Sequence, residues 1–122
     1  MHELSICLSL LQQVEQIARE RGAVQVVGIT LSIGPLSGVE PELLRHAYPL
    51  AAAGTVAEDA ELIVEIADVV VRCSQCDTET TVVPNKLLCG SCGDFRTRVI
   101  AGDELTLMRV ELDRQAEPTG TN

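Results

Sequence analysis

The fold of this 122-residue chain is decided by Cys73-Ser74-Gln75-Cys76 and, after twelve intervening residues, by Cys89-Gly90-Ser91-Cys92. Each CxxC turn presents two sulfurs on one side of a tight loop, so two such turns can place four thiolates around one tetrahedral metal ion. The residues between them suffice for a short hairpin that brings the second pair against the first. We expect zinc, and because four thiolates leave it no open position, a structural site and not a catalytic one.

Other interpretations of these cysteines stay open at the level of sequence. A four-thiolate iron site would have the same spacing. Redox chemistry is disfavoured, because two CxxC pairs at zinc-ribbon spacing are typical of metal binding. A secreted disulfide framework is disfavoured because Met1-His2-Glu3 leads directly into an amphipathic segment without a signal-peptide pattern. The fifth cysteine, Cys7, lies among leucines and is predicted to be a buried core thiol.

Composition excludes several classes of protein. With 46% hydrophobic residues the chain can form one modest domain with a small appendage, and no apolar run reaches the roughly 20 residues that span a bilayer. We expect a soluble, cytoplasmic protein with no membrane partner. A formal charge of -9 and only two aromatic residues, Tyr48 and Phe95, argue against a nucleic-acid partner. A local basic patch remains open, since the cysteine region carries Lys86, Arg96 and Arg98.

The pattern of apolar residues predicts two helices, each followed by a strand. The first helix carries an apolar stripe and ends at Gly22; the stripe comprises Leu4, Cys7, Leu8, Leu11, Val14, Ile17 and Ala18. A half-buried strand follows over 24–33, with Val27, Ile29, Leu31 and Ile33 on one face. The second helix begins at Pro41 and runs to about Ala53. Pro49 should kink or divide it.

Two further strands flank the cysteines. One is predicted from about Glu61 to Arg72, directly before Cys73, and the last from Leu105 to Leu112, with a bulge near Leu107. The fold class is therefore α+β: an αβαβ unit with a three-stranded sheet and two helices, plus a four-cysteine zinc-ribbon lobe inserted before the last strand. We expect a nickel-binding αβ domain over 1–70 with 100–113, a zinc-binding domain over 71–99 and a disordered tail over 114–122.

The amino-terminal residues offer a second set of metal ligands. The α-amine of Met1, the backbone amide and ring of His2, and the amide or carboxylate of Glu3 could surround a metal that accepts square-planar nitrogen donors. Ni(II) and Cu(II) favour that geometry. Taken alone, this signal is weak, and an exposed terminus without a metal is the simpler interpretation.

Three ordered motifs together resemble the HypA family of hydrogenase nickel-incorporation proteins, also called HypA/HybF. They are Met1-His2-Glu3-Leu4-Ser5, the stretch from Ile33-Gly34-Pro35-Leu36 to Pro41-Glu42-Leu43-Leu44, and the two CxxC turns. The similarity runs from Met1 to about Leu112. Two departures are visible: Pro49 interrupts a helix expected to be continuous, and Asp77 replaces a glycine that is common after the first CxxC turn.

The resemblance implies a nickel metallochaperone and not an enzyme. His2 would anchor Ni(II) as transferred cargo, assisted by Met1 and Glu3, and Cys73, Cys76, Cys89 and Cys92 would hold a structural Zn(II). The implied partners are a HypB-type GTPase, the large subunit of [NiFe]-hydrogenase and, in some organisms, urease maturation proteins. The chain itself is expected to be a monomer or a weak homodimer. His46, the only other histidine, is expected at the surface or in packing.

The competing function is a zinc-ribbon adaptor that docks on a protein and binds no second metal. In that case Met1-His2-Glu3 would be incidental. An enzyme is the least favoured class, because the chain has no Ser/His/Asp constellation, no phosphate-binding loop, and no open position at the metal.

Overall fold

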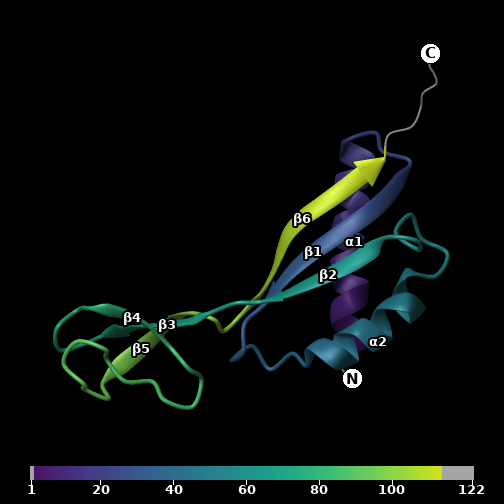
Figure 1. The fold of residues 1–122 in the computed structure, drawn as a ribbon. Helices are drawn as coiled ribbons and strands as arrows, with labels where there is room; N and C mark the ends of the chain where they lie inside the picture. Colours follow the sequence, from purple (N-terminus) through teal and green to yellow (C-terminus); the bar gives the residue numbers. More distant parts are fainter. Residues whose placement is uncertain (1, 114–122) are drawn as a thin grey trace. The chain divides into compact units, whose positions relative to one another are not determined.

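The computed structural model describes residues 2–113, with side chains from Glu3 onward (Figure 1). The predicted tail over 114–122 lies outside these residues. The elements are α1 (His2–Glu20), β1 (Gln25–Ile33), α2 (Pro41–Ala52), β2 (Glu61–Ile66), β3 (Val69–Cys73), β4 (Glu79–Val82), β5 (Thr97–Ala101) and β6 (Leu105–Asp113). Neither of the two described helices is long and apolar enough to cross a membrane.

The chain divides into two compact units. The helix unit combines the residues up to Leu31, Glu40–Val64 and the residues from Leu107 onward, and the cysteine unit combines Ser32–Val39 with Glu65–Thr106. One three-stranded sheet has the order β2-β1-β6, and a second has the order β4-β3-β5 (Figure 1). The predicted α+β class with two helices and a three-stranded sheet is confirmed. The second sheet, around the cysteines, was not predicted.

Helix α1 ends where the sequence indicates. Gly22 has φ 65°, and the N–H groups of Gly22 and Ala23 donate to the carbonyls of Arg19 and Ala18. This pair of bonds satisfies the last carbonyls of the helix, and the left-handed conformation suits a residue without a Cβ.

The buried face of α1 differs in part from the predicted stripe. Cys7, Leu11, Val14 and Ala18 are buried as expected, together with Leu10, which the stripe did not include. Leu4 and Leu8 are 41% and 49% exposed, so their assignment to the core was wrong. The Cys7 thiol donates to the Leu44 carbonyl oxygen at 3.7 Å, which ties α1 to α2 within the core.

Strand β1 is the central strand of its sheet and is buried on both faces from Gly28 to Leu31, whereas Val27, which was predicted on the apolar face, is 43% exposed. Val26, Ile29, Leu31 and Ile33 are almost completely buried, and so is the backbone around Gly28 and Thr30. The prediction of a half-buried strand was therefore wrong for its middle. The cause is tertiary: the sheet places a neighbour on each side of β1, and the Glu111 side chain covers Gly28.

Helix α2 begins at Pro41, in the first-turn position that tolerates proline, and continues unbroken to Ala52. Pro49 lies inside it without dividing it. Leu44, Tyr48, Ala51 and Ala52 are buried around this position, so packing holds the turn that lacks one backbone hydrogen bond. The Tyr48 hydroxyl donates to the Ala57 carbonyl at 3.0 Å and fixes the chain after the helix.

The single strand predicted over 61–72 is in fact two strands in two sheets. It breaks at Ala67 and Asp68: β2 pairs in the first sheet, whereas β3 becomes the centre of the second. Strand β6 (Leu105–Asp113) confirms the strand predicted from Leu105 to Leu112 and is one residue longer, and its alternation changes phase at Met108 and Arg109, which are both exposed.

Two glycines allow a close backbone contact within the cysteine unit. The N–H of Gly34 donates to Glu104, and the N–H of Leu36 donates to Gly102, each at 2.9 Å. A Cβ built on Gly34 would lie 2.2 Å from the Gly102 carbonyl oxygen. There is thus no room for a side chain at Gly34. This contact explains why glycine occupies the position, which the sequence alone suggests is a simple turn residue.

Candidate metal centre

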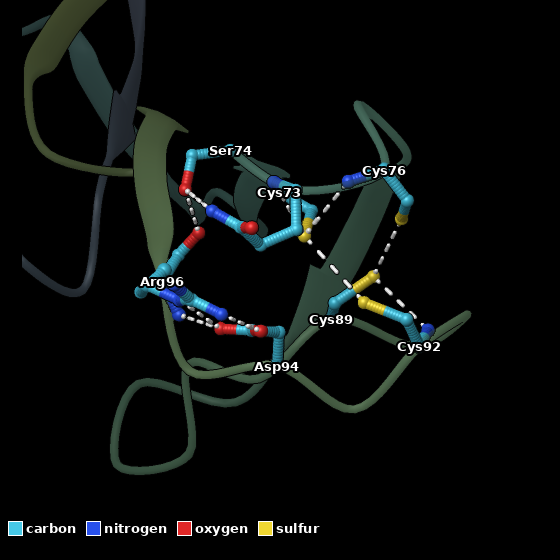
Figure 2. A network of polar contacts seen from close by, with 8 residues as sticks. Cys73, Ser74, Cys76, Cys89, Cys92, Asp94 and Arg96 are labelled. Carbon is cyan, nitrogen blue, oxygen red and sulfur yellow. Dashed lines mark hydrogen bonds and ion pairs between the residues drawn. The ribbon is translucent and has the colours of Figure 1, made fainter.

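The four sulfurs of Cys73, Cys76, Cys89 and Cys92 converge at one point (Figure 2). All lie within 4.8 Å of one another, with Cys73–Cys92 at 3.7 Å and Cys76–Cys89 at 3.5 Å. Sulfurs bound at ~2.3 Å to one tetrahedral zinc lie about 3.8 Å apart. The spacing of these sulfurs therefore fits a four-thiolate metal site.

The first CxxC turn is built around the sulfur of Cys73. The backbone N–H groups of Gln75 and Cys76 point at that sulfur, at 3.3 and 3.5 Å, and the N–H of Asp77 donates to the Cys73 carbonyl at 3.0 Å. Such N–H groups stabilise negative charge on a thiolate.

The second turn repeats this geometry. The N–H groups of Ser91 and Cys92 lie 3.3 and 3.4 Å from the sulfur of Cys89, and the N–H of Gly93 donates to the Cys89 carbonyl at 3.0 Å. Gly93 has φ 76° and its counterpart Asp77 has φ 65°. Asp77, which replaces the glycine that is common at this position, therefore lies in the left-handed region, where glycine is free of strain.

Each CxxC turn is also held by hydrogen bonds to residues that follow it in the chain. The N–H of Cys73 donates to the Thr78 carbonyl, and that of Cys89 to the Asp94 carbonyl, both at 3.0 Å. Ser74 donates twice to the carbonyl of Arg96, through its N–H at 2.9 Å and its hydroxyl at 2.7 Å. These bonds hold the chain just before β5 against the first CxxC turn.

Arg96 also holds Asp94 in place beside the second turn. The guanidinium donates to both carboxylate oxygens, at 3.0 and 2.8 Å, and the Arg96 N–H donates to the same carboxylate at 2.8 Å (Figure 2). These bonds lower the pKa of Asp94 to about 2. The carboxylate therefore remains ionised across the pH range in which thiolates bind metals.

The pKa values of the thiols shift in opposite directions, as expected for four sulfurs that lie close together. Hydrogen bonds from the Thr78 hydroxyl and backbone lower the pKa of Cys76 to about 6. A backbone bond from Asp94 lowers the pKa of Cys92, but the sulfur of Cys73 and burial outweigh it and raise the value to about 12. Four adjacent thiolates need a cation between them, so the donor set fits zinc or another ion that prefers sulfur.

Two threonines form further hydrogen bonds within the cysteine unit, and no short sequence motif predicts these bonds. The Thr80 hydroxyl accepts from the Gly90 N–H at 3.0 Å, and a Cβ on Gly90 would lie 2.9 Å from the Thr80 methyl group. Thr97 donates to the Leu87 carbonyl at 2.8 Å. These contacts join residues ten apart, which is why local spacing did not reveal them.

The predicted nickel ligands are largely beyond the described part of the chain. Met1 and the side chain of His2 lie outside the described residues, so their role stays a prediction. Glu3 is half-buried on α1, and its Oε2 accepts from the Glu40 N–H at 3.3 Å, just before α2. His46 is exposed on α2. Cys7 is fully buried, as predicted, and is far in sequence from the other cysteines.

Residues 1–112 match the family model described as hydrogenase/urease nickel incorporation, metallochaperone, hypA. Hydrogenase maturation factor HypA of Nitrosospira multiformis is 53% identical over 112 residues, covering 92% of this chain and 97% of that protein. The Aquifex aeolicus protein of the same name is 44% identical over 113 residues, covering 93% and 98%.

Solved structures show the same fold. The solution structure of the Ni metallochaperone HypA from Helicobacter pylori has a TM-score of 0.69 at 22% identity, covering 90% of this chain and 96% of that one. Another HypA solution structure has a TM-score of 0.70 at 23% identity, covering 94% and 98%. From its family match and its relatives, the chain belongs to the HypA family of hydrogenase and urease nickel-incorporation metallochaperones.

Proposed function

We propose that this protein binds Ni(II) at Met1-His2-Glu3, delivers it for maturation of [NiFe]-hydrogenase, and is held in shape by a structural zinc ion at its four cysteines. The observation that carries the proposal is the family match, which spans residues 1–112 and so includes both the terminal motif and the CxxC turns. His2 would be the anchoring side chain, with the Met1 amine and the His2 and Glu3 backbone as further ligands.

The local structure supports backbone ligation. Helix α1 begins at His2, so the N–H group of His2 belongs to the first turn, whose donors have no acceptor within the helix. It can lose its proton to a metal without breaking a helical hydrogen bond. The Glu3 carboxylate already accepts from Glu40. We therefore assign the Glu3 contribution to its amide and not to its carboxylate.

The chemistry of such a site suits a carrier. One imidazole and a few ionised backbone groups can be displaced by protons or by ligands of an acceptor, so the ion is held selectively and still released. Imidazole titrates near pH ~6.5 when unperturbed, and amide ligands must be deprotonated. Nickel binding should therefore weaken as the pH falls.

The partners follow from the same role. A HypB-type GTPase and the hydrogenase large subunit would meet this chain during nickel transfer, with urease maturation proteins as acceptors in some organisms. The zinc ion would be structural because the four cysteines fill its coordination sphere. A colourless protein that contains one zinc per chain would separate this assignment from a four-thiolate iron site.

Nickel titration of the untagged, zinc-loaded protein tests the proposal. His2→Ala should abolish the absorption of a planar, amide-ligated Ni(II) site and leave the zinc content at one ion per chain. His46→Ala is the matched control, because it removes the only other histidine, which is exposed on α2. Unchanged nickel affinity in His2→Ala would contradict the assignment of His2 as a nickel ligand. Purely octahedral nickel on the parent protein would favour the adaptor function instead.

A second arm tests the α-amine. Residues added before Met1 should remove the planar spectrum, since the α-amine would be replaced at that position by a backbone amide, which has to lose a proton before it can bind the metal. Retention of the spectrum in the extended protein would exclude Met1 from the ligand set while leaving His2 in place.

A further inference from the structure

One face of the β4-β3-β5 sheet carries two arginines directly opposite each other. Strand β3 is central (Figure 1). Its Arg72 is paired with Glu79 on β4 and with Arg98 on β5, both antiparallel. Residues paired in this way project from the same face with Cβ atoms about 5 Å apart. We call the row formed by Glu79, Arg72 and Arg98 the arginine row.

The charges in the arginine row are unbalanced. Arg72 forms an ion pair with Glu79 through Nη2, but its Nε is buried and has no hydrogen-bond acceptor. Arg98 is exposed and forms no ion pair with any residue that the structure describes. Like charges directly opposite each other destabilise a sheet, and a buried donor without an acceptor costs free energy. Within the arginine row two cations therefore share one anion. Asp77, outside the row, also attracts Arg72, whereas Arg98 has no ion-pair partner among the described residues.

The face around this row is accessible. On the opposite face of the sheet Val69, Val71 and Cys73 are buried, so the core lies on that side. Val70 and Thr81 are paired with each other, two residues along their strands from Arg72 and Glu79; Thr81 is exposed and Val70 is partly exposed. The surroundings of the two arginines thus offer a hydroxyl and an apolar side chain.

We propose that the arginine row binds a carboxylate side chain of an acidic peptide segment in a protein partner. A carboxylate between Arg72 and Arg98 would supply the counter-charge that Arg98 lacks and would also attract the partly exposed guanidinium of Arg72. The planar fork of a guanidinium matches two carboxylate oxygens, and charge-assisted bonds of this kind are the strong ones. Val70 favours a peptide over a free inorganic ion, because this partly exposed apolar side chain can pack against the apolar part of the segment. The proposal is independent of nickel binding at Met1-His2-Glu3.

The test is an NMR titration of the zinc-loaded full chain at low salt, following the Nε–H resonances of arginine. The probes are a short peptide with adjacent glutamates and a leucine, the same peptide with glutamines, and inorganic phosphate. The glutamate peptide should shift the Nε–H signals of Arg72 and Arg98, and the glutamine peptide should not. Equal shifts with both peptides would overturn the proposal, and phosphate binding as tight as the peptide would overturn the peptide as occupant.

Three variants are expected to change the affinity for the peptide in different ways. Arg98→Gln should weaken peptide binding about tenfold, the loss expected for one charge-assisted hydrogen bond. Glu79→Gln should strengthen it, because the competing carboxylate is gone. Lys86→Gln removes a positive charge from the same unit, outside the arginine row, and should leave affinity unchanged. An equal loss in Lys86→Gln and Arg98→Gln would show general charge attraction and refute a defined site.

Folding of the variants is checked separately. Zinc content at one ion per chain should be retained in each, because none of the three residues ligates the metal. Arg98→Glu adds an internal counter-charge for Arg72, so it should raise the thermal midpoint of the zinc-loaded protein and abolish peptide binding. A lowered midpoint would contradict the charge imbalance on which the site depends.

Discussion

Asp77 and Gly93 occupy equivalent positions in the two CxxC turns and share a left-handed backbone, at φ 65° and 76°. For Asp77 this conformation carries a steric cost that glycine avoids. Asp77→Gly should therefore stabilise the zinc-loaded protein by roughly 0.5–1 kcal/mol, since the strain removed exceeds the added flexibility of the unfolded chain. Thermal unfolding in the presence of zinc measures the effect.

Gly93→Ala is the reciprocal variant. No atom lies within 4 Å of a Cβ at Gly93, so only the backbone conformation opposes the substitution. It should destabilise by a similar amount, about 1 kcal/mol. If Asp77→Gly is destabilising, the Asp77 carboxylate contributes something that its geometry does not reveal, and the strain argument fails.

The ligands of this site could be predicted from sequence, whereas their supporting contacts could not. A CxxC turn is a local structure, so the spacing of Cys73, Cys76, Cys89 and Cys92 was sufficient to predict that they meet. The bond from Ser74 to Arg96 spans 22 residues, and that from Gly90 to Thr80 spans ten. Such contacts depend on how the strands pair, and Ser and Thr at these positions carry no local signal of it.

At the scale of elements, the contact between Gly34 and Gly102 determines how two connecting segments pass each other. A methyl group at Gly34 would meet the Gly102 carbonyl carbon at 2.3 Å, and backbone atoms cannot rotate away as a side chain can. Gly34→Ala should destabilise the protein by about 1–3 kcal/mol, in the range of overpacked sites. The free energy of unfolding in urea is the measurement.

Gly28→Ala is the matched control, on β1 a few residues before Gly34. Its Cβ would meet the Glu111 carboxylate at 2.7 Å, which is the end of a flexible side chain that can move. The loss should be clearly smaller than for Gly34→Ala. Equal losses would mean that the segment around Gly102 yields as readily as a side chain does.

Helix α2 makes a different prediction, because Pro49 lies in its interior and is exposed. Proline removes one backbone hydrogen bond and its ring crowds the preceding turn. Pro49→Ala should raise the free energy of unfolding by about 1–3 kcal/mol. A fall in the thermal midpoint would show that the backbone conformation imposed by Pro49 is needed for the packing of Tyr48 and Ala51.

Helices were more predictable than strand partners in this chain. Pro41, Gly22 and Gly54 are local signals, and both helices begin and end close to them. The run 61–72 alternates without interruption, and only its pairing partners divide it at Ala67 and Asp68. Burial of β1 on both faces likewise depends on its central place in the sheet. Periodicity reports which residues are apolar, not which strand lies beside them.

At the scale of the whole molecule, the two units differ in what stabilises them. The helix unit has an apolar core that includes Cys7, Val14, Ile29 and Leu44, whereas the cysteine unit has few large buried side chains besides Val69 and Val71. A small lobe of this kind depends on its metal for folding. We accordingly propose that the metal-dependent part is 71–99, and that the contacts of Gly34, Leu36 and Ala67 outside it survive metal loss.

Removal of zinc by a chelator, followed by hydrogen exchange, tests this division. The N–H groups of Cys73, Asp77, Cys89 and Gly93 should lose protection, because each is held by a turn that the metal closes. The N–H of Ala67, bonded to Ile33, should remain protected together with α1 and β1. Cys92→Ala should reproduce the chelator result without any chelator. Loss of protection throughout α1 would show one cooperative body, and unchanged protection of Cys73 and Cys89 would show that the metal is not structural. The expected result, exchange confined to 71–99, would mean that the zinc lobe folds and unfolds while the helix unit that carries His2 stays intact.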